Sequence, residues 1–84
     1  MNLVVGEDYR IEEKIGQGSY GMIYTATQLS TGKILAAKLE DIKCQIPQVF
    51  YEAKVYMKMQ GYKGIPKIHW VGSTQEFNII IIEL

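Results

Sequence analysis

One helical segment interrupts a chain whose other patterned segments are typical of β-strands, and this order limits the possible folds most. Pro47 is placed like a first-turn helix proline, and good helix formers continue to Gln60, before the C-terminal stop Gly61. The strand-like segments are 9–15, 22–29, 34–40, 65–71 and 77–84. The 84 residues have room for one small domain, residues 1–84. The sequence therefore predicts an α+β fold with three strands, one helix over 47–60 and two further strands.

Charge and composition exclude several functional classes. Lys and Arg number 9 and Asp and Glu number 9, so no net field attracts nucleic acid or an acidic membrane. The longest apolar run, Ile79 to Ile82, is far shorter than the roughly 20 residues needed to cross a bilayer. With Cys44 and His69 as the single cysteine and histidine, neither an internal disulfide nor a structural zinc site is expected, and His69 is interpreted as a surface strand residue. The N-terminus lacks a secretory-signal pattern, so we expect an intracellular protein, cytoplasmic or nuclear, without nucleic-acid or membrane partners.

A glycine cluster follows the first strand-like segment. Residues 16–21 fit the pattern GxGxxG, which lets backbone N–H groups approach a phosphate without interfering Cβ atoms. Met22 and Ile23 occupy the positions where a P-loop needs Lys and then Ser or Thr, so that motif is excluded. A dinucleotide-binding fold needs a helix after its glycines, whereas residues 22–25 favour a strand. Two interpretations remain open: a flap that covers phosphates, and a glycine-rich hairpin turn without a ligand.

A lysine and a glutamate are candidates for the charged part of a phosphate site. Lys38 projects from the strand-like segment 34–40, although it could also be an edge-strand lysine that reaches water. Glu52 shares a helical face with Val49 and Ala53, and we expect this otherwise apolar face to pack on the sheet. Burying a carboxylate on such a face is costly unless a cation compensates its charge. The alternative is that Glu52 lies at the margin of the face and is not buried. We therefore expect an ion pair that fixes the Lys38 ammonium so that it can hold nucleotide phosphates.

These residues resemble a known family. Six positions follow the protein-kinase pattern, with Ile in place of Val in GxGxxGxV: Gly16, Gly18, Gly21, Ile23, Lys38 and Glu52. The stretch Leu35 to Lys38 resembles the VAIK strand, and three further stretches, 38–40, 59–61 and 64–72, are similar to the casein kinase 1 family. The chain thus resembles the N-terminal lobe of a casein kinase 1 family serine/threonine protein kinase over about residues 9–84. This resemblance implies a kinase-like N-lobe with a five-stranded antiparallel sheet and one packed helix.

The resemblance also implies roles for individual residues. The cofactor would be ATP, with Mg²⁺ held mainly by a second lobe and no metal ligand in this chain. Lys38 would contact the α- and β-phosphates, and Glu52 would orient it. The other implied nucleotide-binding residues are the adenine slot (Ile15, Ile23, Ala36), the phosphate-covering residues (Gly16, Gln17, Gly18, Ser19, Tyr20, Gly21), the gatekeeper position (Ile82) and the start of the hinge (Glu83, Leu84).

The implied enzyme would transfer the γ-phosphoryl group of ATP to Ser or Thr of acidic or already phosphorylated protein substrates. The 84 residues contain neither a catalytic-loop Asp nor a DFG motif, so we interpret the chain as a lobe that ends at the hinge and is not competent alone. Apolar surface that would meet the second lobe predicts a homo-oligomer or a strand-exchanged dimer. The alternative function is a non-catalytic interaction module, or a relic kinase lobe, that self-associates or binds partners.

Overall fold

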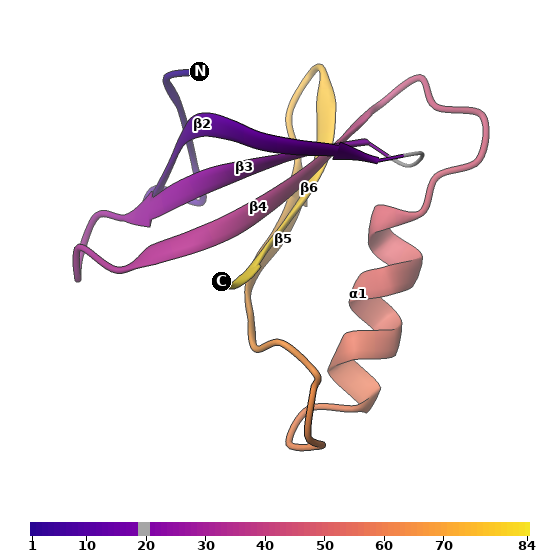
Figure 1. The fold of residues 1–84 in the computed structure, drawn as a ribbon. Helices are drawn as coiled ribbons and strands as arrows, with labels where there is room; N and C mark the ends of the chain where they lie inside the picture. The colour runs from indigo at the N-terminus through magenta and orange to yellow at the C-terminus, as the bar shows by residue number, and fades with distance from the viewer. Residues whose placement is uncertain (19–20) are drawn as a thin grey trace.

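The computed structural model describes residues 1–18 and 21–84, in which one curled antiparallel sheet carries one helix (Figure 1). In chain order the elements are β1 (Leu3–Val5), β2 (Tyr9–Gly18), β3 (Gly21–Gln28), β4 (Ile34–Asp41), α1 (Val49–Lys58), β5 (Ile68–Ser73) and β6 (Phe77–Glu83). The six strands lie in the order β1-β2-β3-β4-β6-β5. The predicted α+β class is confirmed, whereas the expected count of five strands is wrong.

The additional strand is β1, which has three residues and pairs with β2. A strand of this length contains too little alternation to be found in a sequence. Gly6 and Glu7, with φ of 56° and 61°, form the tight turn that returns the chain into β2. A Cβ at Gly6 would lie only 2.7 Å from the indole nitrogen of Trp70, so this turn packs closely against β5.

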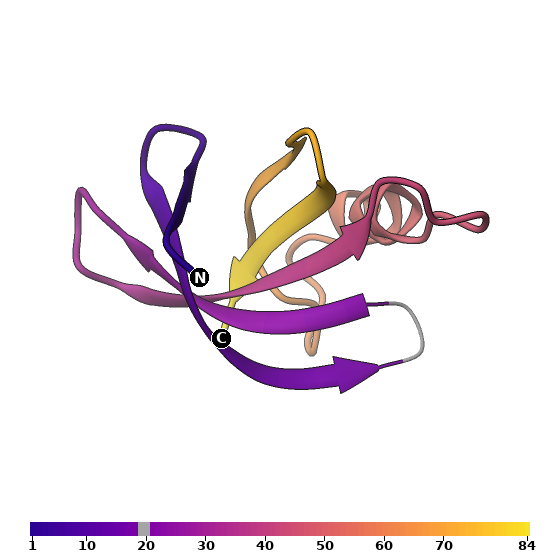
Figure 2. The ribbon, with the colours of Figure 1, turned by 90° about the horizontal axis from the view of Figure 1, so that it is seen from above.

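The sheet curls, so that its two ends approach each other (Figure 2). The hydroxyl of Tyr9 in β2 donates a hydrogen bond of 3.4 Å to the carbonyl of His69 in β5, although three strands separate β2 from β5 in the sheet. The curl encloses the larger core cluster, whose buried members are Val5, Tyr9, Ile11, Ala26, Leu35, Ala37, Leu39, Ile79 and Ile81. This core occupies one face of the sheet.

The helix packs on the other face, where Val49 and Ala53 of α1 form a smaller buried cluster with Ile80 of β6. The side chain of Tyr56 packs against this cluster, as the predicted apolar face of the helix requires. At both ends α1 is two residues shorter than the predicted segment 47–60. Within the described ranges, no helix has the length and apolar character needed to span a bilayer.

The remaining differences from the sequence predictions concern strand ends. β2 continues through Gly16 to Gly18, where a loop was expected. β5 begins at Ile68, three positions later than predicted, because the chain first turns at Gly64, with φ of 86°, and then passes Pro66. β6 lies between β4 and β5, which confirms that this apolar strand is inside the sheet.

Candidate functional site

The predicted ion pair is present: Lys38 Nζ lies 2.7 Å from Glu52 Oε1. β4 is in the middle of the sheet, between β3 and β6, so the edge-strand interpretation of Lys38 is wrong. On α1, Glu52 lies one helical turn from Val49 and next to Ala53, the two buried residues of the helix, and this face directs its carboxylate toward β4. The Lys38 and Glu52 side chains are 24% and 21% exposed, which leaves the ammonium within reach of a ligand.

Apolar side chains surround Lys38 on its face of the sheet. In the strand ladder Lys38 lies opposite Ile23 of β3, and Ala36 lies opposite Ile82 of β6. Paired residues of neighbouring strands point to the same face, and so do residues two apart on one strand, so all four share the face on which α1 packs. Ile15 falls at a register shift of β2 and is 52% exposed, so the ladder does not assign it to this face.

The three motif glycines differ in their structural need for glycine. Gly21 has a φ of 145°, and a Cβ there would collide with the carbonyl oxygen of Leu39 in β4. Gly16 and Gly18 have no positive φ. Among residues 1–18 and 21–84, a Cβ at Gly16 would meet only Ile23, at 3.9 Å, and a Cβ at Gly18 would meet nothing within 4 Å. A hairpin without a ligand therefore accounts for Gly21 alone. The open space above Gly16 and Gly18 is what close approach of a phosphate to the backbone requires.

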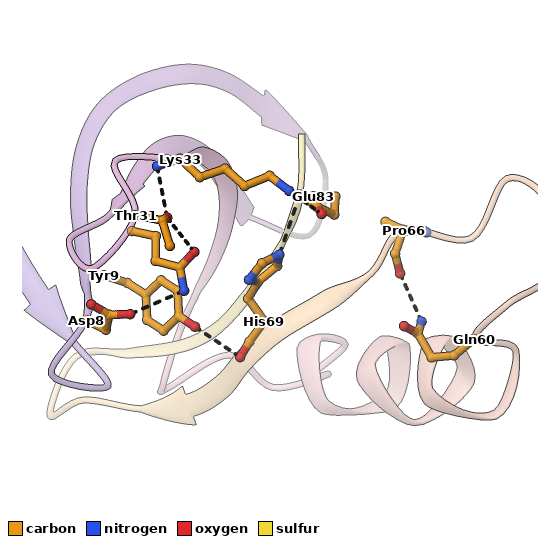
Figure 3. A network of polar contacts seen from close by, with 9 residues as sticks. Asp8, Tyr9, Thr31, Lys33, Gln60, Pro66, His69 and Glu83 are labelled. Carbon is orange, nitrogen blue, oxygen red and sulfur yellow. Dashed lines mark hydrogen bonds and ion pairs between the residues drawn. The ribbon is translucent and has the colours of Figure 1, made fainter.

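At the end of β6, the Glu83 carboxylate lies between the side chains of Lys33 and His69, which come from distant segments of the chain (Figure 3). The Lys33 ammonium donates a 2.7 Å hydrogen bond to Glu83 Oε1, and His69 Nε2 lies 3.5 Å from Glu83 Oε2. The hydrogen bond from Lys33 is the main cause that lowers the pKa of Glu83, partial burial opposes it, and His69 lowers the pKa further. The His69 side chain is only 12% exposed, so its interpretation as a surface residue is wrong.

A buried acid that sequence patterns did not identify lies on the same strand as Lys38. Glu40 is 1% exposed, and its Oε1 accepts hydrogen bonds from the backbone N–H groups of Gln48 and Val49, at 2.7 and 3.2 Å. Its Oε2 accepts a 3.0 Å hydrogen bond from Asn78 Nδ2. The signal available in the sequence was an acid in a strand with apolar neighbours, but two of its three hydrogen-bond donors are backbone groups, which leave no mark in the sequence.

Two pockets of the described residues lie away from the ion pair. One, of about 410 Å³, is lined by Met1, Leu3, Thr74, Gln75, Glu76 and Phe77. The other, of about 260 Å³, is lined by Asp41, Ile42, Lys43, Gln75, Glu76 and Phe77. Neither of these two pockets includes Lys38 or Glu52. Across residues 1–18 and 21–84, no group of three His, Cys, Asp or Glu side chains is placed to hold a metal ion.

The other predicted site residues are placed as follows. Gln17 lies opposite Met22, and its side chain accepts a 2.7 Å hydrogen bond from Lys14. Leu84 follows the end of β6 and is 72% exposed. Ser19 and Tyr20, the predicted tip of the phosphate flap, lie outside the described residues.

A scan against protein-family models finds no family that matches this chain. The interpretation of the site therefore depends on the residues and their geometry.

Proposed function

We propose that this chain is the ATP-binding N-terminal lobe of a casein kinase 1-like serine/threonine protein kinase. In this proposal the strands that carry Gly16, Gly18 and Gly21 cover the phosphates, and the Lys38 ammonium holds the α- and β-phosphates. The γ-phosphoryl group of ATP would pass to a protein Ser or Thr hydroxyl, and the catalytic Asp and the Mg²⁺ ligands would lie outside the 84 residues.

The observation that carries the proposal is the Lys38–Glu52 contact of 2.7 Å on a central strand. A carboxylate beside the ammonium fixes its position and compensates its charge, while its remaining exposure lets it donate to phosphate oxygens. The apolar residues Ile23, Ala36 and Ile82 on the same face suit a planar, weakly polar base. A cation beside such a face is the combination that a nucleotide requires.

The proposal is tested by adding ATP to the ¹⁵N-labelled chain and following its amide signals by NMR. We expect shifts concentrated at residues 16–21 and at Glu83 and Leu84. Adenosine, which lacks phosphates, is the matched ligand and should shift the Glu83 end without the glycine segment. No change with ATP even at millimolar concentration would contradict the proposal.

A second function is favoured by the outer surface of α1. Tyr51 and Met57 are 66% and 57% exposed, so α1 presents two large apolar side chains to solvent. They support an interaction module that binds partners or a second copy without a nucleotide. The two functions separate in the titration above, because the module predicts no response to ATP.

A further inference from the structure

Few contacts of its own residues fix the position of α1, the helix that carries Glu52. Only Val49 and Ala53 among its ten residues are buried, and the N-cap residue Gln48 makes no side-chain capping hydrogen bond. The first N–H groups of a helix need acceptors, and a short helix with two buried residues can tilt or slide unless its end is attached. Glu40 of β4 supplies that attachment through Gln48 and Val49.

Two polar contacts, Lys38 with Glu52 and Glu40 with Gln48, connect β4 to α1 side by side. Lys38 and Glu40 are two residues apart on one strand, which places them on the same face about 6.6 Å apart. Their partners on the helix, Glu52 and Gln48, are four residues apart, or about 6 Å along the axis. Because the two spacings nearly match, the hydrogen bond from Gln48 to Glu40 fixes the position of α1 along β4 at which Glu52 contacts Lys38.

Glu40 is itself held by residues of the neighbouring strands. Asn78 of β6 donates to Glu40 Oε2 at 3.0 Å, and the Ser73 hydroxyl of β5 donates to Asn78 Oδ1 at 2.9 Å. Glu40 and Asn78 are 1% and 7% exposed. These hydrogen bonds leave the buried Glu40 carboxylate little freedom, so Glu40 connects the N-terminus of α1 firmly to β4, β6 and β5.

We propose that Glu40 is a positioning residue for the candidate phosphate site: by holding the N-terminus of α1 on β4, it sets Glu52 opposite Lys38. Its consequence for the nucleotide rests on the proposed function, whereas its effect on the ion pair does not. Glu40 touches no ligand in this role and acts only through the helix.

A graded series of substitutions at Glu40 tests the proposal in the full chain. Glu40→Gln keeps an oxygen for the helix N–H groups, and a flipped Asn78 amide can accept from the introduced NH₂ and donate to Ser73. Glu40→Asp keeps the charge but shortens the side chain by one methylene, so it cannot reach both the helix and Asn78. Glu40→Met removes both connections. The matched control is Asp41→Asn, because Asp41 is exposed on the same strand and its side chain accepts a hydrogen bond from the backbone N–H of Lys43 in its own loop.

The main measurement is the NMR scalar coupling across the hydrogen bond between the Lys38 ammonium nitrogen and the Glu52 carboxyl carbon. We expect it to persist in Glu40→Gln and in the control, to weaken in Glu40→Asp and to vanish in Glu40→Met. The Cα shifts of α1 should stay helical throughout, which separates a displaced helix from a melted one. An unchanged coupling in a folded Glu40→Met chain would overturn the proposal; if that variant does not fold, an unchanged coupling in Glu40→Asp would do so.

The dissociation constant for ATP, measured on the same variants, separates this inference from the proposed function. Loss of one well-placed charge-assisted contact should raise it about tenfold in Glu40→Met. If the unsubstituted chain binds no ATP while the Lys38–Glu52 coupling still follows the series, the positioning role of Glu40 stands and the nucleotide function falls.

Discussion

Among single residues, the glycines of the segment 16–21 differ in how strongly the fold requires glycine. Gly21 needs its identity for the fold, because its φ of 145° brings it against the backbone of β4. Gly16 and Gly18 lie in β2 without a positive φ, and no atom of the part of the chain that the structure describes lies close to where their Cβ atoms would be. Glycine weakens a strand interior, so its presence at these two positions favours a ligand that approaches the backbone.

Substitution by alanine should therefore separate the three positions. We expect Gly16→Ala and Gly18→Ala to change the free energy of unfolding by no more than about 0.5 kcal/mol, yet to weaken ATP binding. Gly21→Ala should cost about 1–3 kcal/mol, because the side chain cannot adopt this backbone conformation without displacing β4. Urea unfolding and ATP titration of the three variants measure both effects. Equal destabilisation by Gly18→Ala and Gly21→Ala would contradict this assignment.

Residue patterns predicted the central contact of the site because each partner breaks the periodicity of its own element. Lys38 is a charge in an apolar strand, and Glu52 is a charge on an apolar helical face, so each required a partner of opposite charge, and each was a natural partner for the other. Glu40 was not found in this way. One of its carboxylate oxygens accepts hydrogen bonds from the backbone N–H groups of Gln48 and Val49. Almost every residue has such a group, so a sequence does not reveal which ones Glu40 meets.

At the scale of elements, the hydrogen bond between Lys33 and Glu83 connects the start of β4 to the end of β6. Leu35 lies opposite Glu83 in the β4–β6 ladder, so this contact closes the ladder at the edge where the hinge is proposed to begin. Its contribution to stability depends on the charge of the Glu83 carboxylate, and hence on pH.

The sign of this dependence follows from the lowered pKa of Glu83, caused mainly by the hydrogen bond from Lys33. In the acid range the folded chain binds fewer protons at Glu83 than the unfolded chain does, so the contribution is full above the ordinary glutamate pKa of about 4.3 and is lost as pH falls through the lower folded value. Lys33→Met should remove this part of the acid dependence while leaving that of Asp8, whose pKa is lowered by Ser30. Urea unfolding from pH 6 to about pH 3 measures the slope. The same slope in Lys33→Met and in the unsubstituted chain would contradict the prediction.

Element boundaries were predicted less well than element types, for physical reasons. The alternation that identified β2 ends at Gly16, yet the strand continues because the glycines still pair with Ile23 and Gly21. β1 became a strand only by pairing with β2, since three residues have no pattern of their own.

At the scale of the whole molecule, sequence patterns did not predict the curl of the sheet. It depends on contacts between residues far apart in the chain, such as Tyr9 with His69 and Gly6 with Trp70. The same curl covers most of the His69 side chain, which a local pattern placed at the surface. Strand twist accumulates over a sheet, so its closure is a property of all six strands together.

The surface of the molecule also predicts self-association. Five large apolar side chains are more than half exposed on α1, the loops beside it and the end of the described chain: Ile46, Tyr51, Met57, Tyr62 and Leu84. Scattered apolar residues are ordinary, but this number on a small domain without net charge favours contacts between copies. Sedimentation velocity at high protein concentration should show a dimer or larger species. A single monomeric boundary across the concentration range would refute this expectation.

The central claim is that the Lys38 ammonium, held by Glu52, binds nucleotide phosphates, and its most direct test is the ATP dissociation constant of Lys38→Met by calorimetry. Lys54→Met is the matched control, because it removes the same charge from an exposed position on α1. We expect Lys38→Met to raise the dissociation constant about tenfold or more and Lys54→Met to leave it unchanged. Equal ATP affinity in Lys38→Met and the unsubstituted chain would contradict this claim.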